Sequence, residues 1–165
     1  MVDEANLSIP VFVTTAVVDQ EPISINDAFT VYRGTMHLKA AGKAFRDAVK
    51  SAVMKSSMDW KTAHECVYQH GGRAELHVTL YFTNLLNKTW TKTNKIKTRY
   101  KKKDASNYIK LIEDGVARGS GIDDCNNLDV TISKRHDPEH PRVEVTLATY
   151  AADRESFITL VDGDG

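Results

Sequence analysis

The chain has 165 residues, enough for one domain with its own hydrophobic core and too few for two of ordinary size. Hydrophobic residues make up 41% of it, and no apolar run is long enough to cross a bilayer. Lysine plus arginine and aspartate plus glutamate both number 22, so the formal net charge is zero. The N-terminus also lacks a basic segment followed by an apolar stretch, so we expect a cytoplasmic protein with no membrane contact.

The first half of the chain predicts a strand, an extended piece and a helix. Residues 9–18 are apolar and rich in β-branched side chains, which is typical of a buried strand. Residues 29–38 follow a turn-rich loop and predict a short extended segment. From residue 41 to residue 58, apolar residues recur at helical spacing, with Phe45 among them, so we expect an amphipathic helix there.

The second half predicts further strands around a second helix. Apolar residues alternate with polar ones over 76–82, the pattern of a half-buried strand. Residues 106–118 predict the second helix. Alternating residues at 130–132 and 143–147 flank the polar loop 136–141, and together they predict a β-hairpin. We therefore expect a single α+β domain with a mixed sheet and two main helices, a core over 9–150, and a frayed tail over 151–165.

Charge is segregated along the chain even though it cancels overall. Between Lys88 and Lys103 there are eight basic residues and no acidic one, which leaves 14 basic residues elsewhere against all 22 acidic ones. A polyanion responds to such a local concentration of positive charge, so this segment predicts DNA contact, as a hairpin or as a mobile loop. Its basic residues are Lys88, Lys92, Lys95, Lys97, Arg99, Lys101, Lys102 and Lys103.

The two cysteines predict no covalent or metal-binding framework. Cys66 and Cys125 lie far apart in the sequence and form no Cys-x-x-Cys pair. We therefore interpret them as free thiols of a reducing compartment. His64, Glu65 and His70 surround Cys66, but their spacing matches no standard zinc site, and the end of a helix explains them better.

The residues that suggest chemistry lie between Asp104 and Asp129. Either Asp104 or Ser106 has the right side chain to cap the second helix. On that helix Asn107, Lys110 and Asp114 form one polar stripe, whereas the apolar residues Ile109, Ile112 and Val116 fall on the opposite side. The pair Asp123 and Asp124 follows the helix.

These residue types suit the hydrolysis of a phosphodiester. The reaction needs a nucleophilic water and neutralisation of charge on the phosphate, and magnesium held by carboxylates supplies both. A lysine beside the ion adds stabilisation of the transition state. Solvated aspartates and an outward Lys–Asp pair are also common on ordinary helices, so the pattern by itself leaves a purely structural interpretation open.

Two segments of the chain resemble the RusA family of Holliday junction resolvases. The stretch 104-DASNYIKLIED-114 followed by 123-DD-124 is similar to the family signature D-x-[D/S]-N-x-x-K-x-x-x-D with a later D-D. Upstream, 21-EPISINDAFTVYRGTMHLKAAGKAFRDAVK-50 is similar to the family's opening, with Pro-x-Ser-x-Asn and then Gly42 and Arg46 on a helix. The basic segment 85–103 looks longer than in short members, which we interpret as an insertion.

The resemblance implies a homodimeric endonuclease that cuts four-way DNA junctions with Mg²⁺, for which Mn²⁺ can substitute. It makes Asp104 and Asp124 metal-binding carboxylates, adds Asp123 and Asp114 as further candidate ligands, and makes Lys110 the essential cation. Asn107 joins the DNA-binding set, either touching DNA or setting local hydrogen bonds. A phage or prophage system for DNA recombination and repair is the expected setting.

Ser106 is a departure from the best-studied form of the family, which has a carboxylate at this position. A hydroxyl is a much poorer magnesium ligand than an ionised carboxylate. Three outcomes are open: Asp123, Asp114 or Glu113 completes the site, or metal binds weakly, or activity is lost.

The positions of Asp104 and Asp124 at opposite ends of one helix pose a geometric question. Thirteen helical residues span about 20 Å. The link from Arg118 to Asp124 also reaches about 20 Å when fully extended. Asp124 therefore meets Asp104 of its own chain only if the link doubles back, and otherwise a partner subunit completes the site. We expect a dimer in both cases, because cutting two opposed strands needs two related sites.

Two other functions remain open. One is a non-catalytic, structure-selective DNA-binding protein of the same fold, in which Ser106 marks a lost metal site. The other is a nuclease that acts on flap or fork DNA instead of four-way junctions. A cleavage assay on synthetic substrates separates all three.

Overall fold

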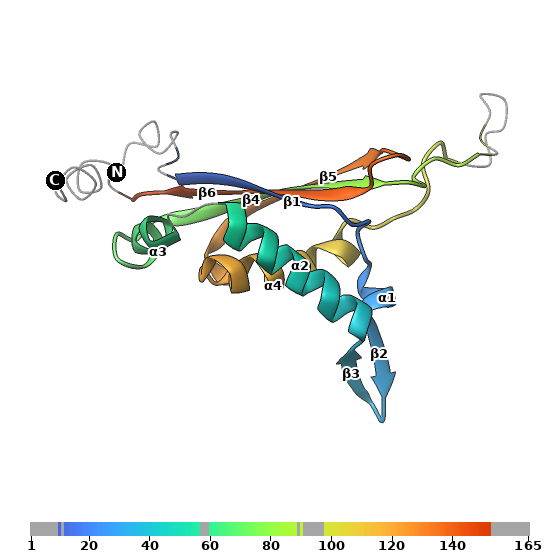
Figure 1. Ribbon diagram of the computed structural model, residues 1–165, viewed down its shortest axis with the longest axis horizontal. Coiled ribbons are helices and arrows are strands. Elements are labelled where there is room, and N and C mark those ends of the chain that lie inside the picture. The colour runs from blue at the N-terminus through green and yellow to red at the C-terminus, as the bar shows by residue number, and fades with distance from the viewer. Residues whose placement is uncertain (1–9, 11, 57–59, 89, 91–97, 153–165) are drawn as a thin grey trace.

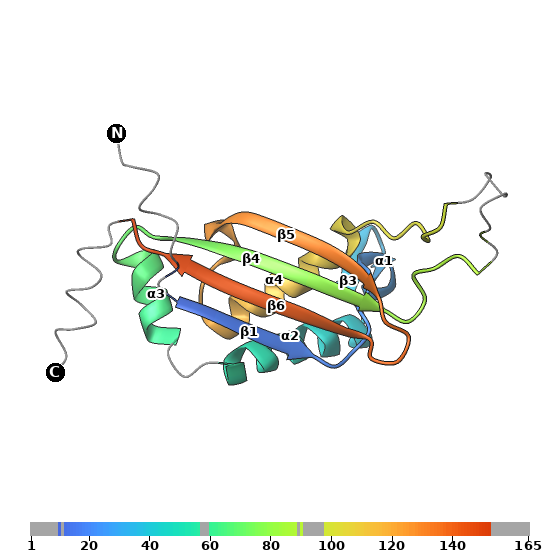
Figure 2. The same ribbon diagram turned by 90° about the horizontal axis from the view of Figure 1, so that it is seen from above.

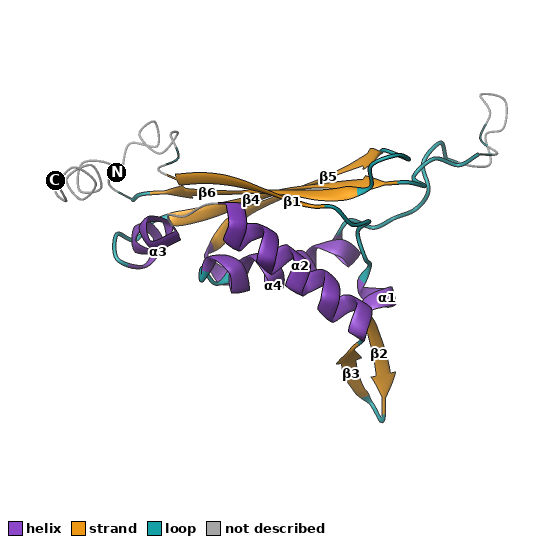
Figure 3. Ribbon diagram, viewed as in Figure 1, coloured by secondary structure: helices purple, strands orange, loops and turns teal. Residues whose placement is uncertain are grey.

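The computed structural model describes residues 10, 12–56, 60–88, 90 and 98–152. It forms a four-stranded mixed sheet with helices packed on one face and a small separate hairpin beside them (Figures 1 and 3). In chain order the elements are β1 (Phe12–Val18), α1 (Ile25–Ala28), β2 (Phe29–Tyr32), β3 (Thr35–Leu38), α2 (Ala40–Ser56), α3 (Trp60–Tyr68), β4 (Arg73–Phe82), α4 (Ser106–Ser120), the 3₁₀ turn η2 (Asp124–Asn126), β5 (Asn127–His136) and β6 (Arg142–Tyr150).

The predicted class is confirmed: the molecule is an α+β domain with one mixed sheet and two main helices, α2 and α4. The strand order is β1-β6-β4-β5, with β4 and β5 parallel and the other neighbours antiparallel. Helix α3 was not predicted as a separate element. Among the described residues no helix is long and apolar enough to cross a membrane.

Strand β4 forms the centre of the core, as its alternation predicted. Leu76, Val78 and Leu80 are at most 2% exposed and face the helices, and their neighbours on β6 are equally buried. The intervening residues point to the other face of the sheet, which is the face seen in Figure 2, with α2 and α4 behind it.

The predicted hairpin of β5 and β6 is wrong. Both strands exist where the alternation placed them, but β4 lies between them and pairs with each (Figure 2). The loop 137–141 crosses the end of β4, where the Asp137 N–H donates to the Phe82 carbonyl at 2.9 Å. Two alternating strands joined by a short polar loop look the same in sequence whether or not a third strand separates them.

Helices α2 and α4 approach closely because glycine occupies the contact. A Cβ atom on Gly115 of α4 would lie 2.6 Å from Val49 Cβ and 2.9 Å from the Arg46 carbonyl oxygen of α2. Gly42 has the same role where α2 passes α1, since a Cβ there would lie 2.8 Å from Ala28 Cβ. The resulting contact fixes α4, and with it the polar residues on its outer side.

The extended segment 29–38 is a two-stranded arm that projects from the body of the domain (Figure 1). Its turn uses Arg33 and Gly34, both at positive φ, 51° and 78°. The arm exposes large apolar side chains, and Val31, Tyr32 and Met36 are each at least 59% exposed.

The two ends of the basic segment are joined by one β-bridge and by backbone hydrogen bonds. Leu86 bridges Tyr100, the Lys101 N–H donates to the Leu85 carbonyl, and the Asn87 N–H donates to the Arg99 carbonyl. The two ends of the segment, at 85–87 and 99–101, therefore pair with each other, as the hairpin alternative expects. The expected strand leading into Asp104 is not formed, and residues 91–97 lie outside the described part.

Candidate active site

Helix α4 carries the predicted polar stripe on the side away from the core. Ile112 and Val116 are at most 2% exposed, whereas the Lys110 side chain is 51% exposed. One turn further along, the Asp114 carboxylate forms an ion pair with the Lys110 ammonium, with Nζ 2.9 Å from Oδ1. The opposed faces of α4 thus confirm the amphipathic prediction and place a cation and a carboxylate together.

The link after α4 doubles back along the helix. Gly121 ends α4 in the left-handed conformation, with φ 74°, and its N–H donates to the Ala117 carbonyl. Ile122 then inserts into the core at 2% exposure. This reversal brings Asp124 Oδ2 to 3.2 Å from Lys110 Nζ within one chain.

Lys110 therefore contacts two carboxylates: that of Asp114, one helical turn away, and that of Asp124, 14 positions further along the chain. Its pKa is raised, chiefly by the hydrogen bond to Asp114 and then by that to Asp124. The ammonium has three N–H donors, and these two bonds use two of them. Glu113 lies next to this group, and burial together with the Asp124 charge raises the pKa of its carboxyl. The group has more carboxylates than cations, which favours a further cation.

Tyr68, at the end of α3, positions the aspartate loop. Its hydroxyl oxygen accepts the Asp123 backbone N–H at 2.9 Å and the Asn126 Nδ2 at 3.2 Å. The ring lies against His64, with centroids 4.3 Å apart. Both accepting positions of the hydroxyl are thus used, so its hydrogen is free to point elsewhere. No sequence pattern pointed to Tyr68, because α3 meets the loop only in the folded chain.

Asp123 has a structural role in the same loop. Its carboxylate caps η2 by accepting the Cys125 N–H at 3.2 Å, and this backbone hydrogen bond is the main cause of its lowered pKa. Hydrogen bonds with the neighbouring Asp124 and Cys125 side chains also lower this pKa, so the Asp123 carboxyl is tied to the loop that carries Asp124.

These groups share one open pocket of about 480 Å³ on the outer side of α4. Its lining residues are Tyr68, Lys110, Asp114, Ala117, Arg118, Gly121, Asp123 and Asp124. The structure thus brings together four of the predicted site residues, Lys110, Asp114, Asp123 and Asp124, with Tyr68 and Arg118 as additions.

Asp104 is not among the residues of this pocket. It lies just before α4, is exposed, and accepts the Asn107 N–H through its backbone carbonyl at 3.1 Å. The predicted capping of α4 by Asp104 or Ser106 is wrong, because the cap position is Ala105 and no side chain bonds there. The backbone turn at 104–107 satisfies this end of the helix instead.

The carboxylates fit a magnesium ion in chemistry but do not form a closed cage. No three described His, Cys, Asp or Glu side chains are grouped closely enough to hold a metal. Magnesium, however, usually keeps several waters and needs only one or two carboxylates plus substrate phosphate oxygens. Asp114 and Asp124, which already converge on a cationic group, meet that requirement.

The predicted DNA-binding residues fall into two groups. Lys92, Lys95 and Lys97 lie outside the described residues. Lys88, Arg99, Lys101, Lys102, Lys103 and Asn107 are described, along the base of the hairpin and the start of α4. The Lys103 ammonium lies over the Phe82 ring, 4.5 Å from its centroid, which fixes the chain immediately before Asp104.

Comparison with protein families supplies the class to which this fold and site belong. The model of the family described as Endodeoxyribonuclease RusA matches residues 20–148 of the chain. A comparison with curated proteins finds no match. Because the family match covers most of the chain, the protein belongs to the RusA family of endodeoxyribonucleases, as the two sequence segments predicted. The family implies action on branched DNA junctions.

Proposed function

We propose that the protein is a metal-dependent endonuclease that cuts four-way DNA junctions in recombination and repair. The observation that carries the proposal is the convergence of Lys110 with Asp114 and Asp124 on one open surface of α4. In a family of endodeoxyribonucleases, this is where the described residues combine carboxylates, a cation and room for a phosphate.

In this proposal Asp124 and Asp114 hold Mg²⁺, with Mn²⁺ as a substitute, and the adjacent Asp123 assists. The ion supplies a polarised phosphate and an activated water. Of the three alternatives raised by Ser106, a site completed by Asp114 and Asp123 has the most support. Both carboxylates line the pocket, whereas Ser106 does not.

Lys110 has the role of charge stabilisation. Its raised pKa keeps the ammonium protonated throughout the neutral range, so it does not act as a base. One of its N–H donors is not used by Asp114 or Asp124, and the side chain is half exposed. This donor is open to a phosphate oxygen, on which negative charge develops during hydrolysis.

We further propose a homodimer in which Asp104 contributes across the subunit boundary. In its own chain Asp104 lies two residues before α4, and it does not line the pocket of Asp124. A four-way junction presents two equivalent strands, which a two-fold symmetric pair of sites matches. A phage or prophage recombination system remains our proposal for the setting.

The test is cleavage of a synthetic four-way junction with and without Mg²⁺, beside linear duplex, flap and fork substrates of the same sequence. Wild type should cut the junction only with metal, and Asp124→Asn should not. The matched control is Glu139→Gln, an exposed carboxylate in the 137–141 loop. Tight binding without any cleavage would instead indicate a non-catalytic junction-binding protein, and preferred cleavage of flaps or forks would assign a different substrate.

The phosphate-contact role of the basic segment has its own test. If Lys101, Lys102 and Lys103 contact DNA backbone, junction affinity should fall steeply with salt. Changing the three to alanine should reduce the slope of log affinity against log salt by about 0.9 for each phosphate that is no longer neutralised. An affinity that does not change with salt would contradict this role.

A further inference from the structure

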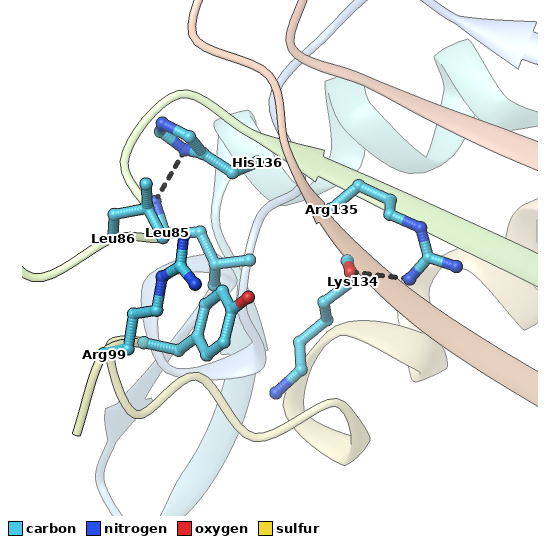
Figure 4. A pocket seen from close by; sticks show the side chains of 7 residues that line it. Leu85, Leu86, Arg99, Lys134, Arg135 and His136 are labelled. Carbon is cyan, nitrogen blue, oxygen red and sulfur yellow. Dashed lines mark hydrogen bonds between the residues drawn. The ribbon is translucent and has the colours of Figure 1, made fainter.

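A second pocket, of about 490 Å³, lies where the base of the basic segment meets the C-terminal end of β5 (Figure 4). It is separate from the carboxylate pocket and shares no lining residue with it. Its lining residues are Leu85, Leu86, Arg99, Tyr100, Lys134, Arg135 and His136.

The charged part of this lining is entirely basic. None of the seven lining residues is acidic, and no described carboxylate forms an ion pair with Arg99, Lys134 or Arg135. Elsewhere in the described chain, cations such as Arg142 are held by carboxylates at 2.8 Å. Cations gathered in a pocket without acidic partners favour an anion.

The polar atoms around the pocket are held in place. Lys134 Nζ donates to the Lys103 carbonyl at 2.6 Å, which leaves two of its N–H groups for another acceptor. Arg135 donates through one terminal nitrogen to the Lys134 carbonyl at 2.9 Å, as Figure 4 shows. His136 Nδ1 faces the Leu85 N–H at 3.4 Å. Anchored cations lose less conformational entropy when they bind a ligand.

The remaining lining is apolar and aromatic. Leu85 is 4% exposed and forms part of the wall, while Tyr100 is 52% exposed. The Arg99 guanidinium lies 5.8 Å from the Tyr100 ring centroid. A flat, exposed aromatic ring beside a cation suits a ligand that joins a planar base to a phosphate.

The pocket is connected along the chain to the candidate active site. Lys134 contacts Lys103, which precedes Lys110 by seven residues. Lys103 lies three residues before α4, and Lys110 lies in the second turn of that helix. The segment that contacts this pocket therefore continues directly into the helix that carries Lys110.

We propose that this pocket binds one unstacked nucleotide of the DNA strand that enters the active site. The base packs on Tyr100 and Leu86, and the phosphate is bound by Arg99 and Lys134. Removing a base from the stack is easiest at a branch point, where stacking is already interrupted. The pocket thus makes the enzyme select branched over continuous duplex DNA. The inference rests on the proposed function and names the part of the substrate that gives selectivity.

The experiment measures binding without divalent metal, so that it does not depend on cleavage. A four-way junction carries 2-aminopurine, whose fluorescence rises on unstacking, at successive positions within about five nucleotides of the branch point. Wild-type protein should raise the emission several-fold at one or two positions. Tyr100→Ala should abolish the rise and weaken junction binding by about 5- to 160-fold, the range for loss of a stacked base.

Tyr32→Ala is the matched control, because Tyr32 is also an exposed tyrosine, 61% exposed, and lies on the arm. It should retain both the fluorescence rise and the affinity. Since Tyr100 is exposed, its replacement should leave the thermal unfolding temperature unchanged, which excludes a folding defect. Arg99→Ala should weaken binding and also reduce the emission.

Four outcomes would overturn the proposal. If Tyr100→Ala binds and fluoresces like wild type, no base occupies the pocket. If Arg99→Ala weakens binding while Tyr100→Ala does not, the pocket is an anion site only. If wild type cuts the junction without any 2-aminopurine response, the proposed function holds and this inference alone fails. If the protein binds no branched DNA, both fail.

Discussion

The Lys110 ammonium lies 3.2 Å from the carboxylate of Asp124, a residue 14 positions further along the chain and beyond the end of the same helix. The contact exists because Gly121 reverses the chain and Ile122 is buried beside α4. It decides the question that the sequence left open, because the link does double back. Asp124 reaches the middle of α4 within one chain, although it reaches Lys110 and not Asp104.

Replacing Lys110 with glutamine should separate catalysis from binding. The variant loses the cation that faces the phosphate, so the cleavage rate should fall by about 100- to 1,000-fold, the usual effect of removing one charge-stabilising donor. Metal-free junction binding should change by only a few-fold. Single-turnover cleavage and equilibrium binding measure the two effects. Lys43→Gln, on the exposed side of α2, is the control and should behave as wild type.

Mixing two inactive variants should reveal whether the site is shared between subunits. Asp104→Asn and Asp124→Asn chains should each be inactive alone. If Asp104 acts across a dimer, refolding them together restores one intact site per heterodimer, and nicking of one junction strand should recover. Cleavage that stays absent in the mixture, with heterodimers present by mass spectrometry, would place all carboxylates of a site in one chain.

Tyr68→Phe should loosen the aspartate loop without unfolding the domain. The change removes two hydrogen bonds, to Asp123 N–H and Asn126 Nδ2, and keeps the ring against His64. Hydrogen exchange at the Asp123 amide should speed up by about 2- to 10-fold, since one such bond contributes about 0.5–1.5 kcal/mol. Mn²⁺ affinity measured by calorimetry should fall as well. Tyr32→Phe is the matched control, and an unchanged Mn²⁺ affinity in Tyr68→Phe would show that the hydroxyl does not position the site.

Gly115→Ala should destabilise the domain through overpacking. The added methyl group would lie 2.6 Å from Val49 Cβ, so α2 and α4 must move apart. Overpacking of this kind costs about 1–3 kcal/mol, which lowers the unfolding temperature by about 2–12 °C for a chain of this size. Calorimetry measures the shift. When Val49→Ala is added, the double variant should lose less unfolding free energy than the two single variants lose in sum, because the two side chains are in contact.

The ion pair of Asp137 and Arg142 should contribute stability only above acidic pH. The Arg142 hydrogen bond, at 2.8 Å, is the main cause of a pKa of Asp137 that is lower in the folded state than its ordinary 3.8. The stabilisation is therefore complete above pH 3.8 and is lost as the pH falls through the lowered pKa. Asp137→Asn should be less stable than wild type at pH 6 and equally stable at the acidic end. A difference that persists unchanged at low pH would exclude this cause.

The patterns that predicted the fold are those with a local physical origin. Alternation over 76–82 and helical spacing over 41–58 reflect the periodicity of strand and helix, so β4 and α2 lie close to their predicted bounds. The pairing of β5 with β4, and not with β6, carries no comparable local signal. It depends on which strand lies between β5 and β6 in the sheet, and that position belongs to β4, whose alternate residues are buried.

By itself the sequence determined the class of fold, the two main helices, the family, and the residue types of the candidate site, because periodicity and motif spacing are properties of the chain alone. Only the tertiary structure decided that Asp124 lies against Lys110, that Tyr68 holds the aspartate loop, and that Asp104 stays outside the pocket. These contacts join segments from separate elements. They form because Gly115 and Ile122 let α4 and the following link pack against the core, and that packing is a property of the whole folded domain.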